Sequence, residues 1–306
     1  MKNVLVIGGN GFIGTNLCDL LVRVGYEVSS FDLVRPGKEN PKVHYLQGDF
    51  FDDETLEKIT EGMDVVIHSL STVNPGNSNE MYMRGYSKDF LQTVKLCEIL
   101  IRKHIKMIFL SSGGTVYGNQ DIQPICEDVR PQPINHYGNI KLCIENTIRT
   151  FNTQLHTKMI IARISNPYGP GQDYHKGVGF IDAVLKKAMA GEDIEIWGDG
   201  TTRRDYIYIQ DACRMIASLI DYRGQEDVFN ISLNRGTSQK EILDIVAALG
   251  LDFKVRYLAG RSVDAKKIIL DNTKIRGIYQ EKLVELETGI RLYHEYLERE
   301  MAKENS

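Results

Sequence analysis

Residues 4–14 read VLVIGGNGFIG, a run of apolar residues followed by closely spaced glycines. The apolar run predicts a buried strand at Val4–Ile7. The glycines fit G-x-G-x-x-G from Gly9 to Gly14, and also G-x-x-G-x-x-G from Gly8 to Gly14. Glycines at these spacings allow a tight turn from strand to helix and a close approach of the backbone to a pyrophosphate. The stretch therefore predicts the first unit of a dinucleotide-binding fold.

The residues of this turn form the candidate phosphate site. A helix that begins here presents free N–H groups and the positive end of its dipole to an anion. We expect the diphosphate of the dinucleotide to be held by the backbone of Gly8, Gly11, Phe12, Ile13 and Gly14. The alternative is that the glycines serve packing only.

Two acidic residues at strand ends are candidate contacts for the adenosine half of the cofactor. Asp32 ends the second predicted strand, and its carboxylate can accept hydrogen bonds from both ribose hydroxyls, which favours NAD over NADP. Arg35 lies nearby and could instead contact a 2′-phosphate; a turn residue is the other interpretation of Asp32. Asp49 follows the third predicted strand and is expected to reach the adenine amino group or, alternatively, to cap the next helix.

Apolar strand-like runs alternate with helical patterns through the first half of the chain. The predicted strands are Val4–Ile7, Val28–Asp32, Val43–Gln47, Val65–His68, Met107–Ser111 and Met159–Ile164. The predicted helices are Asn16–Val24, Asp53–Thr60, Asp89–Lys103 and Tyr137–Phe151. Continuous apolar strands separated by helices indicate an α/β fold, a Rossmann-type doubly wound parallel sheet covered on both faces.

The pattern changes after residue 165, where loops rich in Gly, Pro, Asn and Tyr begin. We predict a Rossmann domain at 1–165 and a smaller, C-terminal substrate-binding domain at 166–306. The two are interleaved, because 204–233 is expected to rejoin the first domain, with Val228–Ser232 as a strand of its sheet. Further elements are predicted at Ile181–Ala190 (helix), Ile194–Ile196 (strand) and Glu285–Ser306 (charged surface helix).

Composition excludes several classes of function. The net charge of −4 gives no reason to expect a nucleic-acid partner or an anionic membrane surface. The five cysteines are odd in number, widely spaced and without a C-x-x-C pair, so we predict reduced thiols and no metal site. No apolar run approaches the roughly 20 residues that span a bilayer. The chain starts in a strand without a signal-peptide pattern, which favours a cytoplasmic protein.

The candidate catalytic pair is Tyr137 and Lys141, spaced as Y-x-x-x-K. Positions i and i+4 of a helix share a face, so both side chains can reach one site. A nearby ammonium and an oxidised nicotinamide both favour the phenolate, which can then act as a base. Lys141 can also hold the nicotinamide ribose. The alternative is a surface pair that arises by chance.

Together these motifs resemble the extended short-chain dehydrogenases/reductases of the NAD-dependent epimerase/dehydratase family, and most closely the UDP-glucose 4-epimerase group. The resemblance runs from residue 1 to about 275. Beyond the glycine turn and the Tyr–Lys pair, it rests on Ser111–Gly118 (SSGGTVYG), Asn166–Gln172 (NPYGPGQ), Trp197–Gly200 (WGDG), Arg204–Tyr206 (RDY) and Arg261…Asp264.

The resemblance implies a nucleotide-sugar site in the second domain. Asn166 is expected to bind phosphate or sugar oxygens, and Arg204 and Arg261 the diphosphate, because a guanidinium gives bidentate, charge-assisted bonds. Asp264 matches the family residue near the nucleotide ribose. Ile268 stands where epimerases set the room around C2 of the sugar, and an isoleucine there leaves space for N-acetyl sugars.

One difference from the epimerase pattern concerns the catalytic hydroxyl. The epimerases usually read SSSATVYG, and their third serine is catalytic, whereas Gly113 stands in its place here. The resemblance implies Thr115 as the replacement hydroxyl, with Ser112 second. Elsewhere Ile140 replaces a serine, and Asp89 stands where the family usually has an asparagine.

The expected reaction is epimerisation at C4 of a UDP-sugar, either glucose/galactose or the N-acetylated pair, through a 4-keto intermediate. A nucleotide-sugar 4-ketoreductase or dehydrogenase with the same Tyr and Lys is the alternative. A dehydratase is disfavoured, because Gly114 and Thr115 stand where dehydratases place a carboxylate. A non-catalytic nucleotide-binding module remains an alternative, because Gly113 stands in place of the catalytic serine. The resemblance also implies a homodimer formed through helices Asp89–Lys103 and Tyr137–Phe151.

Overall fold

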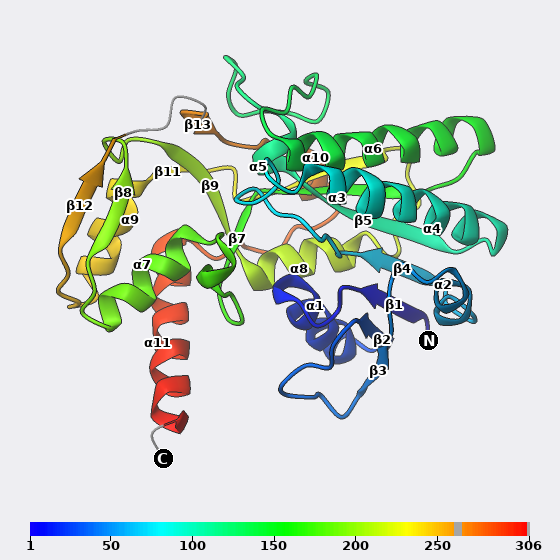
Figure 1. Cartoon of the computed structure of the whole chain (residues 1–306), viewed down its shortest axis with the longest axis horizontal. Helices are drawn as coiled ribbons and strands as arrows, with labels where there is room; N and C mark the ends of the chain where they lie inside the picture. The colour runs from blue at the N-terminus through cyan, green and yellow to red at the C-terminus, as the bar shows by residue number, and fades with distance from the viewer. Residues whose placement is uncertain (260–264, 305–306) are drawn as a thin grey trace.

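Seven parallel strands form the central sheet of the computed structural model, which describes residues 1–259 and 265–304 (Figure 1). Their order is β10-β6-β5-β4-β1-β2-β3. The strands are β1 (Asn3–Ile7), β2 (Glu27–Asp32), β3 (Val43–Gln47), β4 (Val65–His68), β5 (Lys106–Ser112), β6 (Ile160–Ile164) and β10 (Val228–Ile231). The chain runs outward from β1 to β3 and then returns to β4 on the other side of β1. The predicted doubly wound parallel sheet is confirmed.

Helices cover both faces of this sheet because its strands are apolar on both sides. In β1, Val4 and Val6 belong to the core beneath α1 (Phe12–Arg23) and α8 (Ile209–Ser218). Leu5 and Ile7 belong to the opposite core. That core is covered by α2 (Asp53–Ile59), α4 (Leu91–Arg102) and α6 (His136–Leu155). Alternate side chains of one strand thus enter two cores, as the side-chain period of two requires.

Two helices begin earlier than their sequence patterns indicate. Helix α1 starts at Phe12 rather than Asn16, because Gly11 is its extended N-cap and the turn leads directly into the helix. The helix predicted from Asp89 is preceded by α3 (Tyr82–Arg84) and by the π-helical segment η1 (Gly85–Phe90). A π-helical turn breaks the 3.6-residue period on which the prediction relied.

The smaller lobe contains two further sheets. Strand β9 (Arg203–Tyr208) pairs with β7 (Asn166–Tyr168), β11 (Gly236–Ser238) and β13 (Lys267–Ile268), and β8 (Ile194–Trp197) pairs with β12 (Val255–Leu258). Its helical elements are η2 (Tyr174–Lys176), α7 (Phe180–Met189), α9 (Gln239–Ala247) and α11 (Leu286–Glu304), with a short α10 (Thr273–Arg276) beside β10. The strand predicted at Ile194–Ile196 is confirmed as β8, whereas most of the other strands have only two to four residues, too few for a readable pattern.

The segment expected to rejoin the first domain divides between the lobes. Strand β9 lies in the small sheet, whereas α8 packs against α1 and β10 pairs with β6 in the large sheet. The division into domains at residue 165 therefore stays a proposal. Of the helices that the structure describes, none is long and apolar enough to cross a membrane.

A buried ion pair joins α6 to the sheet. Arg163 of β6 is 2 % exposed, and its Nε and Nη2 donate to the Glu145 carboxylate at 3.1 and 2.6 Å. Its Nη1 donates to the Tyr117 hydroxyl at 2.9 Å, at the end of α5 (Gly113–Val116). Ser111 of β5 also donates to Glu145. Four elements are therefore held in register by one carboxylate and one guanidinium.

Replacing Glu145 by Gln leaves the Arg163 guanidinium buried without a counter-charge. We expect this to lower the free energy of unfolding by about 3–5 kcal/mol, because a broken buried pair leaves one charge uncompensated. Urea denaturation followed by circular dichroism measures the change. The control is Lys95→Met, which breaks the exposed pair with Asp53 and should leave the midpoint nearly unchanged. If both substitutions changed the free energy of unfolding by the same small amount, the Glu145–Arg163 pair would not have this stabilising role.

Candidate active site

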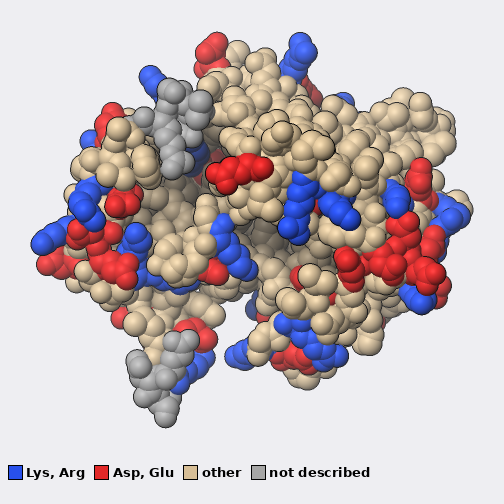
Figure 2. Space-filling view, in the orientation of Figure 1, with Lys and Arg blue, Asp and Glu red and all other residues tan. Residues whose placement is uncertain are grey.

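A cleft of about 660 Å³ opens at the carboxyl ends of the parallel strands, between the large sheet and the smaller lobe. Figure 2 shows the hollow, with Lys and Arg side chains at its rim. Parallel α/β sheets bind ligands at this edge, where the strand order reverses, here between β1 and β4. The lining includes Phe12, Ile13, Ser112, Thr115, Tyr137, Lys141, Asn166, Arg204 and Ile268. Nine residues singled out from the sequence are thus brought to one cavity.

The glycine turn has the shape that a dinucleotide needs. Gly8 has φ +77°, a backbone conformation that favours glycine, and a Cβ on Gly14 would lie 2.2 Å from the Gly8 carbonyl oxygen. A Cβ on Gly11 would meet only that oxygen, at 3.4 Å, so the backbone remains open to a ligand. Within the described part of the chain, no side chain caps the start of α1. The first N–H groups of this helix are therefore available to a pyrophosphate.

Asp32 lies at the end of β2, beside the glycine turn. Its two carboxylate oxygens accept hydrogen bonds from the backbone N–H groups of Asn10 (3.2 Å) and Leu33 (2.8 Å). A carboxylate has about four lone-pair sites, so acceptor capacity remains for ribose hydroxyls. Asp49 is exposed and accepts from the Phe51 N–H at 2.9 Å. The helix cap of α2 is Asp52 instead. The residues present at this end of the site fit NAD.

Helix α6 brings the Tyr–Lys pair to the cleft. Its N-cap, Asn135, accepts a hydrogen bond from the Gly138 N–H at 2.8 Å, which fixes where the helix begins. Lys141 is 3 % exposed, and its Nζ donates to the Leu110 carbonyl at 3.1 Å. The same Nζ lies 4.8 Å from the Phe109 ring centre and 5.7 Å from that of Tyr137. The ammonium is thus held against the phenol ring.

Burial alters the proton affinity of both members of the pair. It lowers the pKa of Lys141 to about 8, against the opposing charges of Asp89 and Glu145. It raises the pKa of Tyr137, and the charge of Asp89 adds to that effect. Base chemistry by Tyr137 therefore requires positive charge close to its oxygen, and Lys141 can supply it only while protonated.

The hydroxyls near this pair come from two residues of the Ser111–Gly118 motif. Ser112 and Thr115 line the cleft, and Thr115 Oγ1 donates only a long hydrogen bond to the Ser112 carbonyl, at 3.3 Å. Gly113 does not line it. A Cβ there would lie 2.3 Å from Leu270 Cδ1 and 3.2 Å from the Arg163 carbonyl oxygen, so it faces the core.

The candidate sugar-nucleotide residues lie on the strands of the smaller lobe. Asn166 of β7 donates to the Asp205 carbonyl at 2.8 Å, and Arg204 of β9 donates to the Arg203 carbonyl at 2.9 Å. Ile268 of β13 is 3 % exposed and closes this side of the cleft. The other two candidates, Arg261 and Asp264, lie outside the described residues.

Sequence patterns missed three polar residues of the cleft. Ser165 Oγ, Gln172 Oε1 and Gln239 Oε1 are buried atoms without a hydrogen-bond partner among the described residues. Buried polar atoms are normally paired, so these are positioned to bind a polar ligand. Gln172 belongs to the NPYGPGQ motif and was within reach of sequence reasoning. Ser165 and Gln239 carry no sequence signal.

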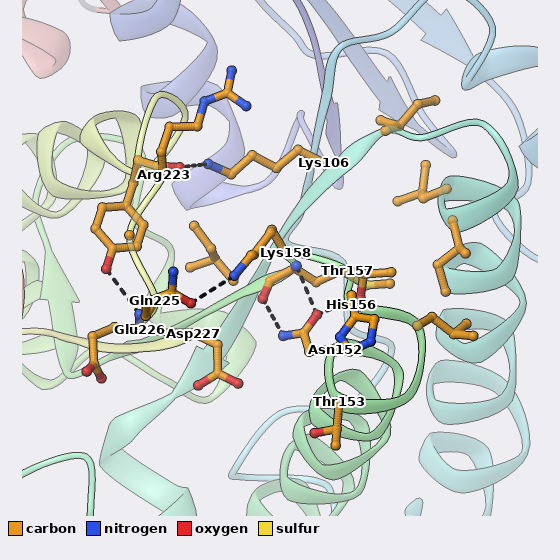
Figure 3. A pocket seen from close by; sticks show the side chains of 18 of the residues that line it. Lys106, Asn152, Thr153, His156, Thr157, Lys158, Arg223, Gln225, Glu226 and Asp227 are labelled. Atoms are coloured by element: carbon orange, nitrogen blue, oxygen red, sulfur yellow. Dashed lines mark hydrogen bonds between the residues drawn. The ribbon is translucent and has the colours of Figure 1, made fainter.

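A second cavity, of about 680 Å³, lies at the opposite edge of the sheet (Figure 3). Its polar groups largely satisfy one another. Lys106 donates to three carbonyls at and after the end of α8, at 2.7–3.1 Å, and Asn152 bonds the backbone of Met159. This second cavity also lies at the amino ends of β5, β6 and β10, away from the Tyr–Lys pair. The cleft, and not this cavity, is therefore the candidate active site.

Comparisons with known proteins agree with this geometry. The family model described as "NAD dependent epimerase/dehydratase family" matches residues 4–232. The putative UDP-glucose 4-epimerase of Methanocaldococcus jannaschii is 31% identical, over 94% of this chain and 96% of the relative. The dTDP-4-dehydro-6-deoxyglucose reductase of Escherichia coli is 33% identical, over 80% and 81%.

Among solved structures, the UDP-glucose 4-epimerase of Thermotoga maritima, crystallised with UDP-glucose, superposes with a TM-score of 0.92. It is 31% identical and the match covers 98% of this chain and 100% of that one. The match covers both lobes, including the described strands that line the cleft. The chain belongs to the NAD-dependent epimerase/dehydratase family.

Proposed function

We propose that this protein is an NAD-dependent epimerase that inverts C4 of a nucleotide sugar, UDP-glucose/UDP-galactose or the N-acetylated pair. The observation that carries the proposal is the convergence of Tyr137, Lys141 and Thr115 in a cleft that also contains the start of α1. The relatives and the solved structure named as UDP-glucose 4-epimerases support the same reaction.

The cleft divides into a cofactor half and a substrate half. We propose that the turn Gly8–Gly14 holds the NAD diphosphate, Asp32 its ribose and Asp49 the adenine. On the other side, Asn166 and Arg204 would bind a UDP-sugar, with Arg261 on the diphosphate and Asp264 near the ribose. The three unpartnered atoms, Ser165 Oγ, Gln172 Oε1 and Gln239 Oε1, support a polar substrate, because each is left to bind something other than protein.

The proposed chemistry uses few protein groups. Bound NAD would supply the acceptor of the C4 hydride, the source from which that hydride returns to the ketone carbon, and, while oxidised, a positively charged ring. Tyr137 takes the proton of the sugar 4-hydroxyl, and C4 becomes a ketone. Lys141 keeps positive charge beside the phenolate, and Thr115 donates a hydrogen bond at the reacting oxygen. After the 4-keto sugar presents its other face, Tyr137 returns the proton and the inverted alcohol forms.

A net reductase of a 4-keto sugar is the second candidate, favoured by the 33% identical reductase of Escherichia coli. It would use the same Tyr137 and Lys141. The two reactions differ in cofactor balance, because an epimerase regenerates NAD in each cycle whereas a reductase consumes NADH.

We also propose a cytoplasmic homodimer formed through α4 and α6. Met83 of α3 and Leu91 of α4 are 63% and 53% exposed, which supports a face that a second copy covers.

The reaction is tested by incubating the protein and NAD with UDP-, dTDP- and GDP-sugars and resolving the products by NMR. We expect interconversion of UDP-glucose and UDP-galactose, and of the N-acetylated pair because Ile268 leaves room at C2. Absorbance at the NADH band should show no net change. Stoichiometric NADH consumption with a 4-keto sugar would favour the reductase. No turnover of any sugar would contradict catalysis.

Tyr137→Phe removes the proposed base while keeping the ring. We expect kcat to fall by about 10²–10⁴-fold, the usual contribution of general acid–base catalysis. NAD affinity, measured by calorimetry, should change little, because the Gly8–Gly14 turn and Asp32 are untouched. Tyr26→Phe is the control, since the Tyr26 hydroxyl bonds Asp221 on the molecular surface away from the cleft. Undiminished turnover in the Tyr137 variant would overturn the base assignment.

Thr115→Ala tests the replacement hydroxyl. We expect kcat to fall by about 10-fold or more, because one hydrogen bond to a charged group contributes about 1.5–3 kcal/mol. Thr115→Ser should retain most activity, since it keeps the oxygen. Gly113→Ser should not raise activity, because its Cβ would meet Leu270 and the Arg163 carbonyl. If instead Ser112→Ala is the damaging change and Thr115→Ala is neutral, the hydroxyl belongs to Ser112.

A further inference from the structure

Asp89 is a buried carboxylate in the π-helical segment η1, 4 % exposed. It accepts hydrogen bonds from the Ser71 hydroxyl (2.8 Å), the Thr72 N–H (2.8 Å) and the Thr72 hydroxyl (2.7 Å). All three donors are neutral. Asp89 forms no ion pair with any residue in the ranges 1–259 and 265–304, so its charge is held in place without a paired cation.

The segment η1 packs directly on the first turns of α6, which carry the Tyr–Lys pair. Tyr86 accepts a hydrogen bond from Asn139 Nδ2 at 2.7 Å and lies 3.2 Å from His136 Nδ1. Gly85 permits the approach, because a Cβ there would lie 2.3 Å from Ile140 Cδ1. Asp89 follows one turn later, and its charge acts on both Tyr137 and Lys141.

The other charged or titratable groups that face Lys141 do not carry an uncompensated negative charge. Glu145, one turn further along α6, is already neutralised by Arg163 of β6. His68 of β4 is fully buried, and burial together with the Lys141 charge lowers its pKa to about 3, so it is neutral. Leu110 of β5 offers only a carbonyl. Asp89 is therefore the one uncompensated negative charge among these groups.

We propose that Asp89 is a positioning residue that acts through electrostatics: its carboxylate, fixed by Ser71 and Thr72, keeps the Lys141 ammonium protonated beside Tyr137. The catalytic role of Asp89 rests on the proposed function. Its effect on the protonation of Lys141 can be measured whether or not that function is correct. The direction of the effect on the Lys141 pKa follows from the charges of the two groups. A neighbouring anion raises the pKa of a lysine, and burial alone would favour the neutral amine. The same anion destabilises the Tyr137 phenolate. Asp89 therefore stabilises the charged form of Lys141 while it disfavours the charged form of Tyr137.

The test replaces the charge while keeping the shape. In Asp89→Asn we expect the titration midpoint of Lys141 to fall, by on the order of one pH unit. NMR of protein labelled with ¹³C at lysine Cε measures it, with Lys141→Met to assign the signal. The alkaline limb of kcat/KM should move to lower pH by a similar amount.

Thr72→Val is the matched control, because it removes one hydrogen bond to Asp89 and leaves its charge. We expect this variant to titrate like the native protein, and thermal melting checks that both variants fold. An unchanged Lys141 midpoint in Asp89→Asn would overturn the proposal, and so would an equal shift in Thr72→Val, which would assign the effect to the loop. If no nucleotide sugar is turned over, the proposed function fails, but the lysine titration still decides this inference.

Discussion

The docking of α6 against the sheet is the constraint on which the site depends. Tyr137, Lys141 and Glu145 follow one another at intervals of four residues and therefore share one face of the helix. The third of them is bound by Arg163 and Ser111, which fixes the rotation and height of the helix. The first two are thereby aimed at the carboxyl edge of the sheet. A buried pair of this kind contributes more to position than to stability, because desolvation offsets much of its attraction.

The parallel sheet brings the two halves of the site together. Reversal of strand order beside β1 leaves an opening at the carboxyl ends, and the start of α1 and the ends of β5 and β6 all line it. The smaller lobe closes the opening with short strands that carry Asn166 and Arg204 beside apolar side chains such as Ile268. Neither half is a site alone: one presents a helix N-terminus and a Tyr–Lys pair, the other an amide and a guanidinium for an anionic, hydroxyl-rich ligand.

Burial creates an electrostatic conflict within this site. It favours a neutral phenol on Tyr137 and a neutral amine on Lys141, whereas the proposed chemistry needs the charged form of each. A fixed anion such as Asp89 favours one of these charges and opposes the other. The pair can then be active only when a further positive charge lies near the phenol. This links proton transfer to the presence of an oxidised cofactor.

The sequence by itself determined the parallel sheet, most of the helices in the first half and the Tyr–Lys pair, because these depend on local periodicity and on motifs that are continuous in the chain. Glycine spacing likewise determined the turn between β1 and α1. Tertiary structure decided the rest. The burial of Asp89, the unpartnered oxygens of Ser165 and Gln239, and the core-facing direction of Gly113 all arise from segments that are distant in sequence. Apart from β8, which was predicted as Ile194–Ile196, the short strands of the smaller lobe escaped prediction, since they are stabilised by pairing with distant strands rather than by their own composition.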